Sequence, residues 1–444
     1  MPVPERPETS RDSTFLIALI AATAVAELWM AWRYFGFLTG DDVEVLAEAF
    51  RMAVGFKYRA WDIRCLFVPD FFVAPFVWLG ARITSDVRTL VIFATIPSIT
   101  ASAISTWLVY ALAMKWTHER RIARAAAMLF ALHWIPLGFA STVYPRTIAT
   151  AAILGAVYVL QRAPWIAGAL CALAFADRFS EIVFLIPVLM IARRRAVAVL
   201  AGFAATAVVI VGFHDYLTWG EWFGSLRRFA ALTLVQSDFA SRVKHQSPFW
   251  YLFNIARWFS PLLLPFVWYA RRHASMLFVV IPLIALSIIQ HKELRYLQAV
   301  IPFAMLLAAI GFGAMRQRRV ATVLLMAGML WNLYGVRFVA TKSMPSVEAA
   351  QMLGADRSVN GVAMSQLWAY GDRLYFGDRM PVVDVGTPPR DLANALRYVD
   401  AACFYESDLT PDIMSTLRDR RFAAMRAFRD GRARAVVVFR RVTR

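Results

Sequence analysis

Residues 196–213 read AVAVLAGFAATAVVIVGF, an apolar run without a single charged side chain. A helix needs roughly 20 predominantly apolar residues to cross the hydrocarbon core of a bilayer. Runs of this kind recur through most of the chain, in which 59% of the 444 residues are hydrophobic and 18% are charged. Soluble domains average about 45–50% apolar and about 25% charged residues. The sequence therefore predicts an all-α, polytopic membrane protein.

Length and polarity select roughly eleven candidate membrane spans, within a range of about 10–13. The first run lacks a signal-peptide cleavage site and is followed by further spans, so we expect it to be retained as a helix. The candidates are Thr14–Trp32, Val87–Met114, Ala123–Ala140, Thr147–Leu160, Trp165–Ala176, Ile182–Ile191, Ala196–Phe213, Trp250–Ala270, Met276–Gln290, Leu297–Ala314 and Val320–Val339.

Basic residues fall in short loops on one side of this alternating pattern. The positive-inside rule places such loops in the cytoplasm. We therefore attribute the formal charge of +18 to loop residues that set the orientation of the protein in the membrane. Nucleic-acid binding is not expected. The basic loops contain Lys115, Arg120, Arg121, Arg124, Arg162, Arg193–Arg195, Arg271, Arg272, Arg316, Arg318 and Arg319.

The opposite, extracytoplasmic side receives the long segments of the chain. We expect a transmembrane catalytic domain over 1–340, with long extracytoplasmic loops at 39–86 and 214–249. Residues 341–444 are more polar and predict a small extracytoplasmic α/β domain. Strand-like runs lie at Gly361–Met364, Ala401–Tyr405 and Ala433–Phe439, and helical patterns at Ser346–Leu353 and Asp412–Phe428.

Acidic residues open the first long loop. Its apolar residues Val43, Leu46, Ala47 and Phe50 recur at helical spacing, which predicts an interfacial helix with an acidic start. Carboxylates there are stabilised as anions by the helix dipole. A solvated helix cap is the alternative, but ionisable residues at membrane-span ends favour a functional role. The acids are Asp41, Asp42, Glu44 and Glu48.

Basic residues gather between two later spans, in the segment His291-Lys292-Glu293-Leu294-Arg295-Tyr296. Lysine as a point charge, arginine as a bidentate donor and histidine together suit a phosphate group. Glu293 is expected to hold Lys292 or Arg295 in place, and a plain polar hairpin is the alternative. Arg146 and Arg178 begin spans on the same side, where each alone is more often an interfacial anchor.

Several motifs of other reaction classes are absent. The sequence contains no D-x-D, no phosphate-binding G-x-x-x-x-G-K-[ST], no H-E-x-x-H and no G-x-S-x-G. The three cysteines, Cys65, Cys171 and Cys403, match neither a metal spacing nor a disulfide framework. A lipid-linked donor therefore fits better than a metal-bound soluble nucleotide.

The segment His291–Tyr296, followed by Pro302, resembles the H-K-E-x-R-F…P signature of glycosyltransferase family 22, the GT-C mannosyltransferases related to GPI-anchor and dolichol-linked oligosaccharide enzymes. Further segments resemble family motifs in the same chain order. They are Asp41-Asp42 with Glu48, Trp61-Asp62-Ile63-Arg64, Arg146-Thr147-Ile148, Arg178 with Ser180, Asp215 with Gly220 and Trp222, and Ser247–Tyr251 with Trp250. The chain departs from the usual pattern at Asp42 for Glu, Cys65 for Ser, Thr150 for Asn, Ile153 for Glu and Phe179 for Pro.

This resemblance implies a GT-C fold and inverting transfer of mannose or another hexose from a polyprenyl-phosphate sugar to a glycan or lipid acceptor, without metal or cofactor. It implies Asp41 as the base that accepts the acceptor's proton, with Asp42 second. The leaving phosphate requires positive charge, expected from His291, Lys292, Arg295, Arg146 and Arg178. Supporting roles are expected for Glu293, Glu48, Trp61, Asp62, Arg64, Asp215, Trp222 and Trp250.

Two other classes of function remain open. A lipid or solute transporter would explain the spans and the charges at their ends, but not the long first loop. A phosphoethanolamine or acyl transferase would need a metal cluster or an activated nucleophile. The short loops between spans and the extracytoplasmic motifs favour a bacterial inner membrane, with the active site on the periplasmic side.

Overall fold

The computed structural model describes residues 10–34, 40–58, 60–235, 246–289, 291–338, 344–365, 372–377, 380–386, 389–429 and 435–442. The chain forms two compact units. The first contains residues 1–29, 61–68 and 96–336, and the second contains 30–60, 69–95 and 337–444. The division at residue 340 expected from the sequence stays a prediction.

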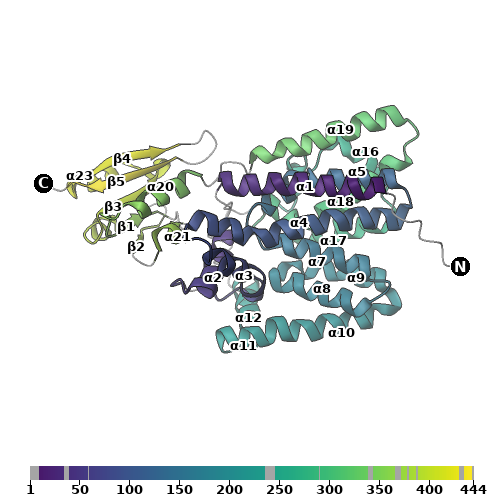
Figure 1. The fold of residues 1–444 in the computed structure, drawn as a ribbon, viewed down its shortest axis with the longest axis horizontal. Helices are drawn as coiled ribbons and strands as arrows, with labels where there is room; N and C mark the ends of the chain where they lie inside the picture. The colour runs from purple at the N-terminus through teal and green to yellow at the C-terminus, as the bar shows by residue number, and fades with distance from the viewer. Residues whose placement is uncertain are drawn as a thin grey trace. The chain divides into compact units, whose positions relative to one another are not determined.

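The first unit is helical (Figure 1). Two of its helices, α1 (Ser10–Tyr34) and α4 (Val87–Thr117), extend into the second unit. The others are α5 (Arg120–Ala131), α6 (Trp134–Ala140), α7 (Arg146–Val159), α8 (Pro164–Asp177), α9 (Leu185–Ala192), α10 (Ala196–Ala207), α11 (His214–Trp219), α12 (Gly224–Ala230), α14 (Trp250–Phe253), α15 (Ile255–Trp258), α16 (Leu264–Tyr269), α17 (Leu277–Ile288), α18 (Ile301–Ala314) and α19 (Arg318–Tyr334).

Four helical stretches of the described residues are long and apolar enough to cross a membrane, or five if the bent pair α5 and α6 is one span. The four are Asp12–Arg33, Val87–Thr117, Phe179–Trp219 and Arg318–Phe338. Helices α7, α8, α17 and α18 are also apolar but have only 12–14 residues. The helices expected in these places are confirmed, while the total of roughly eleven spans stays a prediction.

The 41-residue stretch Phe179–Trp219 is better divided into two spans. A straight helix of that length would measure about 60 Å, twice the thickness of the hydrocarbon core. Arg193 has φ 51°, a left-handed value that a helix interior does not tolerate. The chain therefore turns at the basic triplet Arg193–Arg195 between α9 and α10, as the charge pattern indicates.

Two expected spans are irregular. Helices α5 and α6 meet at an angle of 57°, where the His133 ring accepts a hydrogen bond from the Ile135 amide. The prediction of a continuous span at Trp250–Ala270 is wrong, because this segment consists of α14, α15, a 3₁₀ turn at Pro261–Leu263 and α16. Pro261 cannot donate a helical hydrogen bond, and it favours the extended conformation observed at Ser260.

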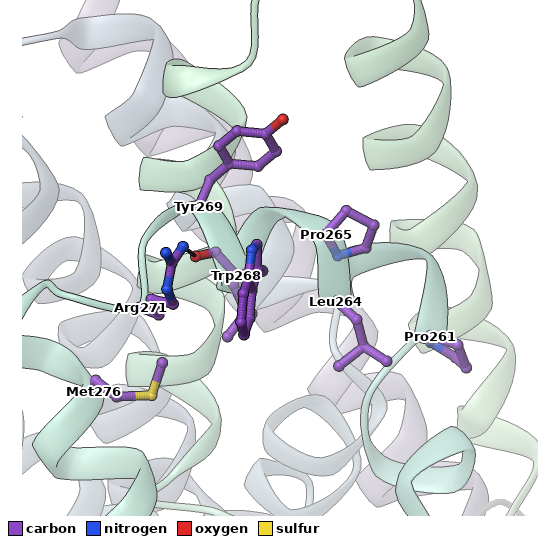
Figure 2. A pocket seen from close by; sticks show the side chains of 8 residues that line it. Pro261, Leu264, Pro265, Trp268, Tyr269, Arg271 and Met276 are labelled. Carbon is purple, nitrogen blue, oxygen red and sulfur yellow. Dashed lines mark hydrogen bonds between the residues drawn. The ribbon is translucent and has the colours of Figure 1, made fainter.

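An apolar groove of about 820 Å³ lies along α16 (Figure 2). Leu264, Pro265 and Trp268 contribute to its wall, and the guanidinium of Arg271 lies 4.2 Å from the centre of the Trp268 ring. The same guanidinium donates to the Trp268 carbonyl at 2.8 Å. An arginine–tryptophan pair of this kind is typical of an interfacial anchor, and among the described residues that line the groove no set of polar groups converges.

Close backbone packing joins α8 and α10 (Figure 1). A Cβ atom at Gly168 would overlap the carbonyl oxygen of Val199, and one at Gly202 would overlap the carbonyl of Trp165. Glycine is required at both places because each helix backbone lies against the other. Small residues of this kind are typical of membrane helix pairs that pack at short range.

The second unit contains α2 (Gly40–Val54), a π-helical turn at Pro69–Val73 and α3 (Ala74–Ala81). It also contains a mixed sheet of order β2-β1-β3-β5-β4, in which β1 is parallel to both neighbours and β5 is antiparallel to both of its own. The strands are β1 (Val362–Met364), β2 (Val382–Asp384), β3 (Ala401–Tyr405), β4 (Phe422–Phe428) and β5 (Val436–Arg441). The accompanying helices are α20 (Met344–Ala355), α21 (Asp372–Phe376), α22 (Leu392–Ala395) and α23 (Pro411–Asp419).

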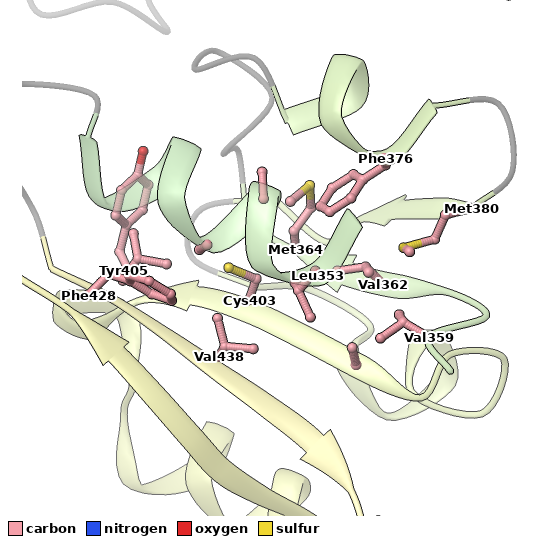
Figure 3. Close-up of a cluster of buried hydrophobic side chains, with 14 residues drawn as sticks. Leu353, Val359, Val362, Met364, Phe376, Met380, Cys403, Tyr405, Phe428 and Val438 are labelled. Carbon is pink, nitrogen blue, oxygen red and sulfur yellow. The ribbon is translucent and has the colours of Figure 1, made fainter. Parts of the chain in front are cut away.

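Alternate residues of each strand enter two apolar layers. Leu353 of α20 packs with Val362, Cys403 and Val438 on one face of the sheet (Figure 3). Ala402, Phe404 and Phe439 face the other layer, with Leu396 and with Leu417 of α23. The strands expected at 361–364 and 401–405 are present as β1 and β3, and the one expected at 433–439 is present as β5 from Val436, since 433 and 434 lie outside the described residues. The helix expected over Asp412–Phe428 ends at Asp419, and Arg421 (φ 61°) precedes β4.

The contact between α8 and α10 predicts opposite effects of one substitution at two glycines. Gly168→Ala should lower the thermal unfolding midpoint in detergent, because the methyl group forces the helices apart at a cost of about 1–3 kcal/mol. Gly155→Ala in α7 is the matched control: its Cβ would lie 3.3 Å from the flexible tip of Leu170. Alanine also favours a helix by about 1 kcal/mol over glycine. Equal midpoints for the two variants would contradict this description of the packing.

Candidate active site

The segment after α17 places a carboxylate between an imidazole and a guanidinium group. The Nε2 atom of His291 lies 3.1 Å from the carboxylate oxygen Oε1 of Glu293. The Glu293 carboxylate also forms an ion pair with Arg295. Tyr251 donates its hydroxyl proton to the Glu293 carbonyl oxygen at 3.3 Å. The expectation that Glu293 holds Arg295 is confirmed, and the partner of Glu293 besides Arg295 is His291 rather than Lys292.

Lys292 points into the protein. Its side chain is only 2% exposed, and its ammonium donates to the main-chain carbonyls of Gln246 (3.2 Å) and Ile289. Burial lowers the pKa of Lys292, because the charged form loses hydration. In this arrangement Lys292 joins residues 246–250 to the end of α17, and its phosphate-binding role stays a prediction.

Arg146 is buried at the start of α7 and forms an ion pair with Glu181. A second nitrogen of the same guanidinium donates to Ser180 Oγ at 2.9 Å. Glu181 lies in the 3₁₀ segment Phe179–Phe184 and is also buried. Sequence reasoning missed Glu181, although an acid at the beginning of an apolar span is itself a signal of a buried partner.

Two guanidinium groups flank one tyrosine ring. Arg146 lies 4.8 Å from the centre of the Tyr296 ring, and Arg295 lies 5.7 Å from it. Arg295 also lies 5.5 Å from the Tyr144 ring, just before α7. Cation–π contacts hold each guanidinium plane against a ring and leave its edge to donate hydrogen bonds. The start of α7, residues 179–184 and residues 291–297 therefore form one polar cluster, which we call the arginine cluster.

Two further residues expected at the site, Arg178 and Trp250, lie in other segments of the first unit. Arg178 is half-buried at the end of α8, where the preceding Asp177 accepts the Ala149 amide of α7 at 2.9 Å. Trp250 begins α14 and has its ring 5.1 Å from that of Tyr251. The contact of Asp177 with Ala149 fixes the end of α8 against the beginning of α7.

A second group of expected residues forms its own cluster. Arg228 Nε donates to the Asp62 carbonyl at 3.1 Å and lies 3.4 Å from the Asp62 carboxylate. Arg64 lies 5.8 Å from the centre of the Trp61 ring, while Trp222 is exposed and stacks on Tyr216. Asp215 accepts the Ser225 amide and hydroxyl at 2.9 and 2.6 Å. This group ties residues 61–65 to the segment that begins with α11.

The acidic residues of the first loop belong to the second unit. The expected helix is confirmed as α2, with Val43, Leu46, Ala47 and Phe50 buried. Asp41 and Asp42 are 7% and 0% exposed, so the alternative of a solvated helix cap is wrong. The apolar residues that follow them on α2 pack inward, so the two carboxylates at the beginning of the helix are buried as well.

Glu48 lies on the same helix and is fully buried. Arg51 Nε donates to both oxygens of its carboxylate, at 3.0 and 2.9 Å. Burial raises the pKa of Glu48, an effect that the hydrogen bond from Arg51 opposes and the nearby Asp70 reinforces. Glu48 therefore supports α2 through a local ion pair.

The Alg9-like mannosyltransferase family model matches residues 55–352, more than half of the chain. The chain belongs to this family. The matched residues include the whole arginine cluster, whereas Asp41, Asp42 and Glu48 lie before them. A search of curated proteins found no match.

Two solved structures of one protein, ArnT, show the fold. ArnT from Cupriavidus metallidurans in the apo state is 12% identical, with a TM-score of 0.61 and coverage of 96% of this chain and 98% of ArnT. The same protein bound to undecaprenyl phosphate is 14% identical, with a TM-score of 0.60 and coverage of 95% and 97%. Arabinosyltransferase EmbB from Mycobacterium smegmatis is 10% identical, with a TM-score of 0.45 and coverage of 80% and 33%. This member of the mannosyltransferase family is thus an integral membrane protein with the GT-C fold.

The buried pair of Arg146 and Glu181 predicts a specific pattern of stability. Glu181→Gln should lower the free energy of unfolding by about 3–5 kcal/mol, because it leaves the Arg146 charge buried without its counter-ion. The double variant Arg146→Met with Glu181→Leu should recover most of this loss, since two apolar side chains replace the pair. Chemical denaturation in detergent measures the free energy of unfolding of the parent protein, of Glu181→Gln and of the double variant.

The exposed pair of Glu406 and Arg429 is the matched control for this prediction. Glu406→Gln should leave the denaturation midpoint unchanged, because water screens that pair. Two results would contradict the prediction: a Glu181→Gln protein as stable as the parent, or a double variant less stable than Glu181→Gln. Either would show that the ion pair does not hold α7 to residues 179–184.

Proposed function

We propose that this protein transfers mannose or another hexose from a polyprenyl-phosphate sugar to an extracytoplasmic glycan or lipid acceptor. The observation that carries the proposal is the family match over residues 55–352, which contains the arginine cluster. ArnT shares the fold, and one of its structures holds undecaprenyl phosphate, a lipid carrier of the class proposed here. The proposed location is a bacterial inner membrane, with the site on the periplasmic side, opposite the basic loops.

The proposed reaction is a single displacement with inversion. The acceptor oxygen forms a bond to the anomeric carbon while the bond from that carbon to the phosphate oxygen breaks. The acceptor's proton passes to the base, for which we propose Asp41, with Asp42 as the second candidate. The bond electrons leave with the polyprenyl phosphate, so negative charge grows on its oxygen.

The arginine cluster suits that growing charge. Arg295 and His291 lie at one end of α17 around Glu293, and Arg146 lies against the same Tyr296 ring as Arg295. Fixed cationic donors stabilise a charge that develops in the transition state without having to reorganise. No metal or cofactor is assigned to this step, because the guanidinium groups supply positive charge.

Substitution of Asp41 tests the base. Asp41→Asn should reduce hexose transfer by about 10²-fold or more, because the amide cannot accept the proton. The assay follows radiolabelled mannose from polyprenyl-phosphomannose to octyl mannoside in proteoliposomes. Glu44→Gln, on the same helix, is the matched control and should retain activity. Full activity of Asp41→Asn would remove the base assignment.

The same proteoliposomes separate an enzyme from a transporter. A glycosyltransferase converts the labelled lipid to labelled octyl mannoside, whereas a flippase moves the intact lipid between leaflets. Label that crosses the bilayer without entering octyl mannoside or any other acceptor in the vesicles would favour the transporter and contradict the proposed function.

Substitution of Arg295 tests the phosphate side. Arg295→Ala should raise the KM for the lipid donor by about 10–100-fold, since a charge-assisted hydrogen bond contributes about 1.5–3 kcal/mol. The KM for octyl mannoside should change little. Arg429→Ala, which removes an exposed guanidinium just after β4, serves as the control. A normal donor KM in Arg295→Ala would place the phosphate elsewhere.

A further inference from the structure

Three side chains with different metal-binding atoms meet in the first unit. The thiol of Cys65, the imidazole of His214 and the carboxylate of Asp215 each offer one ligand atom, and these atoms lie within 4.8 Å of one another. All three residues are buried. Among the residues that the structure describes, this is the one group of three or more such side chains in range of a common ion.

Neighbouring groups hold the three side chains in place. The Cys65 thiol donates to the Ile210 carbonyl at 3.4 Å, which brings residues 61–68 against the end of the α10 span. The His214 ring meets the Phe67 ring edge to face, with centres 5.8 Å apart. Phe175, Ile210 and Val211 belong to the apolar cluster that surrounds Cys65. The group therefore lies in surroundings from which water is largely excluded.

Asp215 supplies a second, independent observation. One of its oxygens, Oδ2, accepts both hydrogen bonds from Ser225. The other, Oδ1, is buried and has no hydrogen-bond partner among the described residues. A buried carboxylate oxygen without a partner is unfavourable, and a bound cation would satisfy it.

We propose that Cys65, His214 and Asp215 bind one divalent transition-metal ion, for which zinc is the best match. Zinc binds sulfur, nitrogen and oxygen ligands in a tetrahedron with bonds of about 2.0–2.3 Å, so the three side chains would supply three of its four ligands and a water molecule the fourth. Ligand atoms of such a site lie about 3.3–3.8 Å apart. Side-chain rotations that move the three ligand atoms by about 1 Å would therefore bring them to bonding positions. The Cys65 thiol releases its proton as the sulfur–metal bond forms.

The proposed ion has a structural role, distinct from the sugar transfer. His214 and Asp215 begin α11, and Cys65 follows the segment that carries Trp61, Asp62 and Arg64. A metal bound to all three would fasten residues 61–68 to α11 beside the contact of Asp62 with Arg228.

Cobalt titration tests the site, because a Co²⁺–thiolate bond has a charge-transfer absorption band that oxygen and nitrogen ligands do not produce. The full-length protein, purified through a tag without histidine and treated with chelator, is titrated with Co²⁺ in detergent. We expect one equivalent to produce the thiolate band and Zn²⁺ to remove it. Cys65→Ser should lose the band. Cys171→Ser, which removes another buried thiol in α8, should keep it.

Three outcomes would overturn the proposal: no thiolate band in the parent protein, a band that survives in Cys65→Ser, or a band that disappears in Cys171→Ser. Should Cys65→Ser not fold, Asp215→Asn decides by affinity. Loss of a charged ligand should weaken Co²⁺ binding by at least about 10-fold, and unchanged binding would equally overturn the site.

Discussion

Charges buried among apolar helices need a partner of opposite sign, and this constraint accounts for much of the first unit. Arg146 is buried where water cannot hydrate it, and Glu181 lies against it. The same compensation occurs at Asp12, which is buried beneath Arg120 and Arg124 at 2.9 and 2.5 Å. Unpaired, each of these charges would cost several kcal/mol. The pairs therefore set which helix ends meet: α7 with residues 179–184, and α1 with α5.

This compensation also bears on the proposed chemistry. Glu293 is the partner of both His291 and Arg295, so the positive charge of the arginine cluster is partly neutralised before any anion arrives. Under the proposed function, a donor phosphate competes with Glu293 for the Arg295 guanidinium. Arg146 differs, because Glu181 and Ser180 already occupy two of its nitrogens. Its contact with Tyr296 suits the orientation of that ring better than direct binding of phosphate.

The sequence predicts those elements whose formation is local. Apolar runs identify α1, α4, α7, α8, α17, α18 and α19, because lipid leaves the backbone no alternative to helical hydrogen bonds. The run at Trp250–Ala270 misleads, since its apolar composition conceals the helix break at Pro261. Pairs of side chains that meet in the fold are harder to predict from the sequence. Glu181 and Arg146 are far apart in the chain, and the spacing of ionisable residues says nothing of which pairs meet. Burial of Asp41 and Asp42 likewise depends on what α2 packs against.

Lys292 shows why a motif alone does not assign a role. In the sequence it stands between His291 and Glu293 and suggests a phosphate ligand, yet its ammonium binds the carbonyls of Gln246 and Ile289. These contacts hold the residues that lead into Trp250 and Tyr251, and Tyr251 in turn holds the Glu293 carbonyl. Loss of Lys292 would thus displace the carboxylate that orients His291 and Arg295. A positioning role of this kind predicts reduced activity as surely as lost phosphate binding does. The two differ in one respect, because a positioning lysine acts through Arg295, so the effects of substituting both residues should not add.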